Sequence, residues 1–126
     1  MGQEEFFEKL RTAGVDVDDA VARFAGNTGL FMKFICRFPE NLDFETMRRT
    51  IEAGDEEEFH RQMHTLKGVA GNLGVMKTYA SAEELLVELR AHKLENVDLL
   101  KKHLAKIEQE CKMVCDVLEE YQAGKD

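Results

Sequence analysis

The sequence predicts an all-α protein: an antiparallel up-down four-helix bundle with short N-terminal helices packed at one end. Apolar residues recur with a helical period along the chain, and the sustained apolar–polar alternation of a strand is missing. The composition is rich in the Glu, Lys, Leu and Ala that favour helices, and Pro39 is the only proline among 126 residues. Short connections between the predicted helices favour antiparallel neighbours.

The whole chain, residues 1–126, is expected to be one domain, and residues 1–40 are predicted to form three short helices. The first covers residues 3–13, and Asp16 or Asp18 caps the second. A third, strongly apolar helix is expected to stop before Pro39, because a residue preceding proline disfavours the helical conformation. The apolar residues of the first and third helices are Phe6, Phe7, Leu10, Leu30, Phe31, Phe34, Ile35 and Phe38, and of these Phe31, Phe34 and Phe38 are expected in the core.

Residues 43–122 supply the four predicted bundle helices, at 44–53, 55–74, 75–92 and 97–122. Residues typical of helix ends mark them: N-caps at Asp43, Asp55 and Asn96, and terminal glycines at Gly54 and Gly74. The last helix carries apolar residues at alternating four- and three-residue spacing, which requires helical partners along its length. The positions expected to face inward on the last two helices are Tyr79, Ala82, Leu85, Leu86, Leu89, Leu100, Leu104, Ile107, Cys111, Val114, Leu118 and Tyr121.

Composition excludes several classes of function. A net charge of −8 argues against a nucleic-acid partner, since such binding needs a basic face. The chain has no apolar run long enough to cross a bilayer and no signal peptide, so we expect a cytoplasmic monomer without membrane contact. The odd number of cysteines favours buried thiols over a disulfide or metal role; they are Cys36, Cys111 and Cys115.

The second predicted bundle helix, residues 55–74, carries the most informative residue, His64. On a helical wheel the apolar residues gather on one side, and the opposite side carries His60, His64, Lys67, Gly68 and Gly71. Each glycine in a helix interior costs about 1 kcal/mol relative to alanine, so both bare positions need a reason. An exposed imidazole nucleophile, a lysine within side-chain reach and two glycines that admit a partner indicate a histidine that becomes phosphorylated.

The histidines also allow two other interpretations. A lone exposed histidine is most often a solvated surface residue, and His60 with His64 has the spacing of a metal-ligand pair. The glutamate of a metalloprotease motif does not follow His60, and a third ligand is not evident, so His60 is better explained as a neighbour on a docking surface. We expect His92 and His103 to be surface residues.

The run His64-Thr65-Leu66-Lys67-Gly68-Val69-Ala70-Gly71-Asn72-Leu73-Gly74 resembles the signature of histidine phosphotransfer domains, the intermediates of multistep phosphorelays. Residues 15–34 resemble the N-terminal region of that family. The resemblance implies a phosphocarrier without kinase activity, in which His64 takes a phosphoryl group from the aspartyl phosphate of one receiver domain and passes it to the aspartate of another. A hybrid histidine kinase is a further expected partner. No cofactor is expected in this chain, because the Mg²⁺ of the reaction would belong to the receiver.

Two alternatives stay open at this stage: a phosphoacceptor module of a larger histidine kinase, and a helical adaptor that binds receivers without transfer. Met1 and the short polar tail favour an independent protein, and an intact His64 and Lys67 count against the adaptor. Members of the family often place a glutamine near the phosphorylated ring, whereas this chain has none between Gln62 and Gln109. Arg90 is the residue we expect could replace it as a second phosphate contact.

Overall fold

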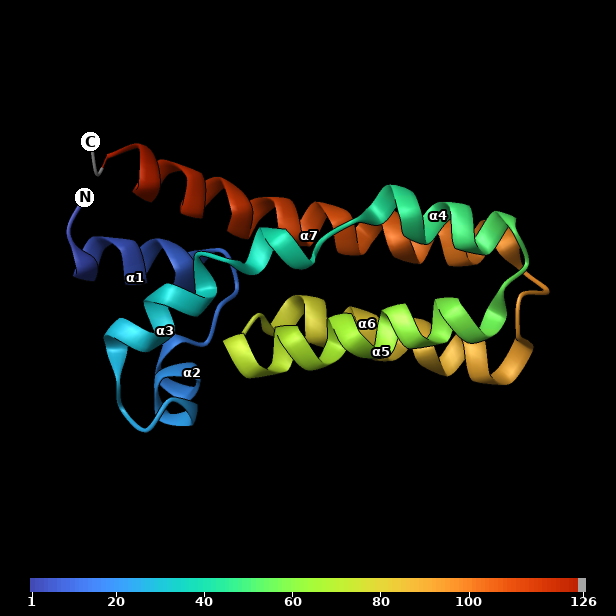
Figure 1. Cartoon of the computed structure of the whole chain (residues 1–126), viewed down its shortest axis with the longest axis horizontal. Coiled ribbons are helices and arrows are strands. Elements are labelled where there is room, and N and C mark those ends of the chain that lie inside the picture. Colours follow the sequence, from blue (N-terminus) through green and yellow to red (C-terminus); the bar gives the residue numbers. More distant parts are fainter. Residues whose placement is uncertain (125–126) are drawn as a thin grey trace.

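A computed structural model describes residues 1–124, and in these residues the chain folds into seven α-helices and one 3-10 helix (Figure 1). The helices α4 to α7 run alternately up and down as a bundle, which confirms the predicted fold class. The elements are α1 (Gln3–Thr12), α2 (Val17–Arg23), α3 (Thr28–Ile35), η1 (Phe38–Asn41), α4 (Phe44–Glu52), α5 (Glu56–Leu73), α6 (Met76–His92) and α7 (Val97–Ala123).

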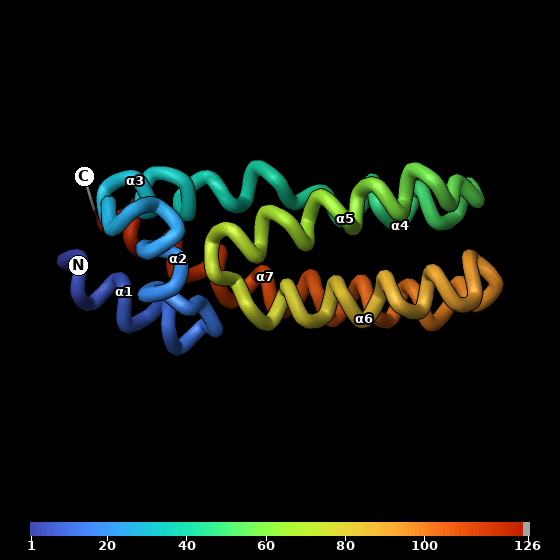
Figure 2. The backbone as a smooth tube through the Cα atoms, turned by 90° about the horizontal axis from the view of Figure 1, so that it is seen from below, coloured from blue at the N-terminus to red at the C-terminus, as the bar shows by residue number. Residues whose placement is uncertain are grey.

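The longest helix, α7, connects the two parts of the molecule. Its 27 residues extend over about 40 Å, so its N-terminal half lies in the bundle and its C-terminal half lies beside the N-terminal helices (Figure 2). There the ring of Phe6 on α1 stacks on that of Tyr121, with centroids 4.0 Å apart and ring planes 11° apart. Helices α1 to α3 therefore cover one end of the bundle, as predicted.

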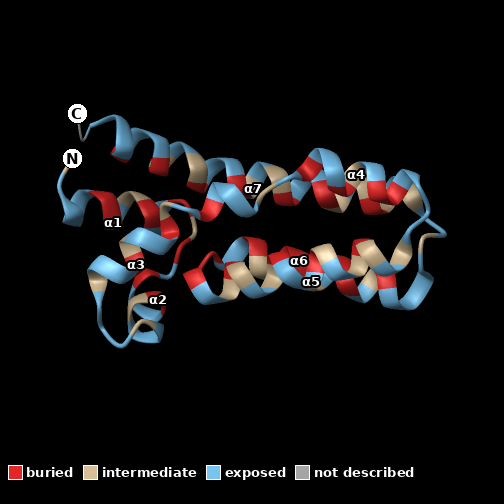
Figure 3. Ribbon diagram, in the orientation of Figure 1, coloured by how far each residue is buried: buried red, intermediate tan, exposed pale blue. Residues whose placement is uncertain are grey.

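The core follows the predicted apolar stripes (Figure 3). Along α7 every residue of the predicted stripe is buried, and on α6 four of the five predicted positions are buried, while Tyr79 is half-buried. Thr78 and Ser81 occupy buried places on α6 that hydrophobicity did not predict. A helix that sits between two neighbours needs a wider buried face than its apolar residues alone provide.

Side-chain caps fix the helix ends as expected. In each case the carboxylate or amide oxygen accepts a hydrogen bond from a backbone N–H in the first turn, which satisfies one otherwise unpaired donor. Of the two candidates for α2, Asp16 is the cap, and it accepts from the Asp19 N–H at 3.1 Å. The caps at the bundle helices are Asp43, Asp55 and Asn96.

The third N-terminal helix differs from its prediction. It ends at Ile35, and Pro39 lies in the first turn of η1, where a missing N–H leaves no hydrogen bond unmade. Phe34 was expected in the core, yet it is 41% exposed, and Leu30 is 38% exposed. An eight-residue helix that packs through one face buries only one row of its apolar residues; the buried ones are Phe31 on α3 itself, with Ile35 at its end and Phe38 in η1.

The prediction of three buried thiols is correct only for Cys111. Its sulfur lies 3.4 Å from the hydroxyl of Thr78, and burial raises the pKa of the thiol to about 12. Cys36, which directly follows α3, and Cys115 on α7 are half-buried.

The turn between α5 and α6 attaches the N-terminal helices to the end of the bundle. Gly74 has φ +73° and ends α5, and its carbonyl accepts a hydrogen bond from the Asp16 N–H at 2.8 Å. A Cβ at this position would lie 2.5 Å from the carbonyl oxygen of Asp16, so only glycine fits. Within the described part of the chain, none of the helices is both long and apolar enough to span a membrane.

Candidate functional site

His64 lies near the middle of α5 and is exposed, as predicted. The helix is held by Asp55 at its N-terminus and by left-handed Gly74 at its C-terminus, so the backbone around the imidazole is regular. Its core-facing side is buried through Phe59, Met63, Leu66, Ala70 and Leu73. The imidazole is therefore presented to solvent on a rigid helix, available to another molecule.

Gly68 leaves open space one turn after His64. It is exposed, and a Cβ built on its backbone meets no atom within 4 Å. Because packing does not require a glycine here, an alanine would fit and would favour the helix. The open position thus agrees with the interpretation that an approaching partner needs this surface bare.

Gly71 has a packing reason in addition to its predicted role in partner access. A Cβ at this position would lie 3.1 Å and 3.2 Å from two carbon atoms of the Tyr79 ring. The missing side chain therefore makes room for a tyrosine that packs between α5 and α6. Tyr79, which was predicted to face the core, is only half-buried.

Lys67 forms an ion pair across the two helices. Its Nζ donates to Oε2 of Glu83 on α6 at 2.5 Å, and it lies 5.4 Å from the centroid of the Tyr79 ring. The lysine side chain is only 24% exposed. The sequence predicted an ammonium beside His64, and the structure places the ammonium on a carboxylate of the next helix.

Arg90, the expected second cation, reaches the same carboxylate. Its Nη2 donates to Oε1 of Glu83 at 3.2 Å, so one carboxylate joins the guanidinium to Lys67. The hydrogen bond from Lys67, together with the charges of both cations, lowers the pKa of Glu83 below its ordinary value. Two cations and one anion therefore lie together on the α6 side of His64.

The sequence analysis did not predict the contact of Glu83 with Lys67, although the antiparallel register of α5 and α6 could have indicated it. Antiparallel helices joined by a tight turn bring together residues at equal distances from that turn. Gly71 and Tyr79 stand four residues on either side of Val75, and Lys67 and Glu83 stand eight residues on either side. Both pairs are in contact.

His60 lies one turn before His64 and is half-buried. The two imidazole rings have centroids 6.3 Å apart and planes 16° apart, so the histidines are neighbours on one face. Among residues 1–124, no three His, Cys, Asp or Glu side chains are grouped so as to hold a metal ion.

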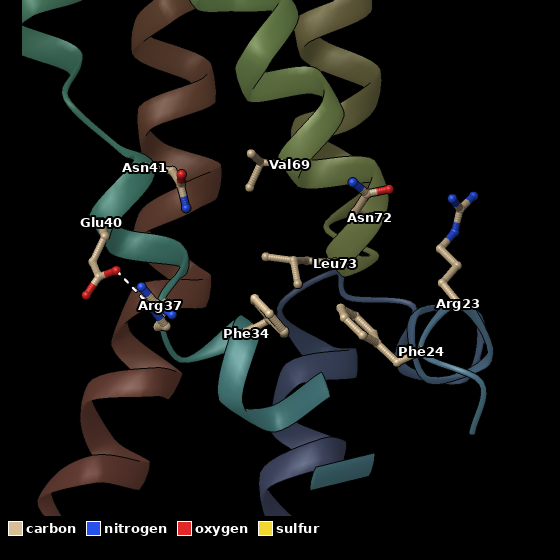
Figure 4. Close-up of a pocket in the computed structure, with 9 residues that line it drawn as sticks. All are labelled: Arg23, Phe24, Phe34, Arg37, Glu40, Asn41, Val69, Asn72 and Leu73. Carbon is tan, nitrogen blue, oxygen red and sulfur yellow. Dashed lines mark hydrogen bonds and ion pairs between the residues drawn. The ribbon is translucent and has the colours of Figure 1, made fainter. Parts of the chain in front are cut away.

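An open pocket of about 470 Å³ lies between the C-terminal end of α5 and the N-terminal helices (Figure 4). The rings of Phe24 and Phe34 stack with centroids 5.5 Å apart, and Val69 and Leu73 extend toward the pocket from α5. Its polar rim consists of Arg23, Arg37, Glu40, Asn41 and Asn72. We call these nine residues the shelf. The shelf adjoins the side of α5 that does not face α6.

The comparison with protein families agrees with this arrangement. The family model described as Hpt domain matches residues 40–122, which contain α4 to α6, all but the last residue of α7, and all the predicted site residues. No significant match was found among curated proteins or among solved structures. The chain belongs to the Hpt domain family. Members of this family are histidine phosphocarriers of phosphorelays, have no kinase activity of their own and interact with receiver domains.

Proposed function

We propose that His64 accepts a phosphoryl group from the aspartyl phosphate of one receiver domain and passes it to the aspartate of another. A lone pair of the imidazole attacks phosphorus in line with the leaving carboxylate. The new N–P bond forms as the aspartyl P–O bond breaks, and the carboxylate leaves with the bonding electrons. The reverse sequence discharges the group onto the second receiver, and Mg²⁺ would be held by the receiver's acidic pocket.

One observation carries this proposal: the exposed imidazole of His64 stands beside the open space at Gly68, within the region that matches the Hpt family. An in-line displacement needs the nucleophile within about 3.5 Å of phosphorus, so the partner's active site must come into contact with α5. A side chain at position 68 would stand in that approach path.

The shelf supports a receiver as the molecule that covers this face. It exposes the ring of Phe34 beside charged and amide groups, a mixture typical of transient protein interfaces. Val69 and Asn72 belong both to the shelf and to α5, within eight residues of His64. A receiver docked on the shelf would therefore reach the histidine without leaving the same surface.

The test is transfer from a receiver that carries a labelled aspartyl phosphate. We expect the chain to gain an acid-labile, base-stable label, and His64→Gln to abolish it. His103→Gln is the matched control, because this histidine lies on α7 outside the predicted site and should leave the label intact. Substitution at the exposed His64 should change the unfolding free energy by no more than about 0.5 kcal/mol.

The same experiment separates phosphotransfer from binding without transfer. Receiver binding without any label would indicate a non-transferring adaptor and would contradict the proposal. A label that persists in His64→Gln would show that another residue is phosphorylated. A catalytic ATP-binding domain elsewhere in the gene product would make this chain the phosphoacceptor module of a larger kinase.

A further inference from the structure

The ammonium of Lys67 is held by side chains of α6. It contacts Glu83 and the ring of Tyr79, and Tyr79 stands opposite Gly71, one turn further from the histidine. Lys67 is three residues from His64 on the helix, so a change of rotamer could bring the ammonium to a group on the imidazole. Such a move would break its bond to Glu83.

A phosphoryl group on His64 would offer a competing acceptor. It carries up to two negative charges on three oxygens, against one charge on the carboxylate of Glu83. The same carboxylate also accepts from Arg90, so Glu83 retains a cationic partner when Lys67 leaves. In this arrangement the ammonium of Lys67 could bind either the carboxylate of Glu83 or a phosphoryl group on His64.

We propose that Glu83 competes with the phosphoryl group on His64 for the ammonium of Lys67, and thereby sets how readily the phosphohistidine is discharged. The inference rests on the proposed phosphorylation of His64. Glu83 acts here as a positioning residue, because it reaches the reacting group only through Lys67. Without Glu83 the ammonium would remain on the phosphoryl oxygens, stabilise the charged ground state and slow breakage of the N–P bond.

The experiment loads the protein with phosphoramidate, which transfers its phosphoryl group to an imidazole as the donor P–N bond breaks and ammonia leaves. The ³¹P NMR signal that His64→Gln removes is followed during hydrolysis. We expect Glu83→Gln to lengthen its half-life about two- to fivefold, the range that one surface ion pair typically controls. Glu84→Gln is the matched control: it removes the neighbouring carboxylate, whose partner is Lys106 at 3.6 Å, and should leave the half-life unchanged.

A double variant tests whether the effect passes through the lysine. In a Lys67→Ala background, Glu83→Gln should lengthen the half-life much less than it does in the wild type. An equal effect in both backgrounds, or a shortened half-life in Glu83→Gln, would overturn the competition. If no ³¹P signal depends on His64, the proposed function fails. If the signal forms but its half-life is unchanged in Glu83→Gln, only this inference fails.

Discussion

Alanine substitutions at Gly68 and Gly71 distinguish the two reasons for which α5 keeps a glycine. Both positions lie inside the helix, where alanine is favoured by about 1 kcal/mol. At Gly68 the new Cβ meets nothing within 4 Å, so the full gain should appear. This corresponds to a rise in Tm of about 4 °C for a domain of this size.

At Gly71 the same substitution places Cβ 3.1 Å from the Tyr79 ring, closer than ordinary van der Waals contact. The ring must shift, and overpacking of this kind costs about 1–3 kcal/mol. The cost equals or exceeds the gain in propensity. We therefore expect Gly71→Ala to leave the stability unchanged or to lower it by up to about 2 kcal/mol.

Urea denaturation followed by circular dichroism measures both effects, with Tyr79→Ala as the background that removes the ring. There Gly71→Ala should regain about 1 kcal/mol, as Gly68→Ala does in the wild type. If Gly71→Ala stabilised the wild-type protein as much as Gly68→Ala does, the packing explanation of Gly71 would be refuted.

Three further predictions concern access, docking and pH. Gly68→Gln should slow phosphotransfer strongly, because its side chain would enter the open space beside His64; a wild-type rate in stopped-flow transfer would contradict the steric interpretation. Phe34→Ala should weaken receiver binding in a titration. Met113→Ala is the control and should leave binding unchanged, because Met113 is as exposed as Phe34 (43% against 41%) but lies on α7, diagonally across the bundle from α5. Equal losses of affinity in both variants would exclude the shelf as the docking surface. The pKa of Cys111 is raised from 9.0 to about 12, so the unfolded chain ionises first and stability is lost as the pH rises above 9. Between pH 8 and pH 10 the unfolding free energy of the wild type should fall by about 1.4 kcal/mol more than that of Cys111→Ala, and parallel curves would contradict this assignment.

The sequence by itself determined the elements of the bundle and the residue at the centre of the site. Helical periodicity identified the buried stripe of α7, and capping residues such as Asp55 and Asn96 marked the helix ends, because both signals depend on residues a few positions apart. The exposure of His64 followed in the same way from its place opposite the apolar face of α5. Local spacing was sufficient for all of these.

Only the tertiary structure decided what each site residue contacts. The turn at Gly74 sets the register of α5 against α6 and so brings Lys67 and Arg90 to the same carboxylate, Glu83. The exposure of Phe34 depends on which face of α3 packs against the rest of the molecule. The lack of room for a side chain at Gly71 likewise depends on Tyr79 from the following helix. These contacts join residues on different helices, so periodicity within one helix carries no information about them.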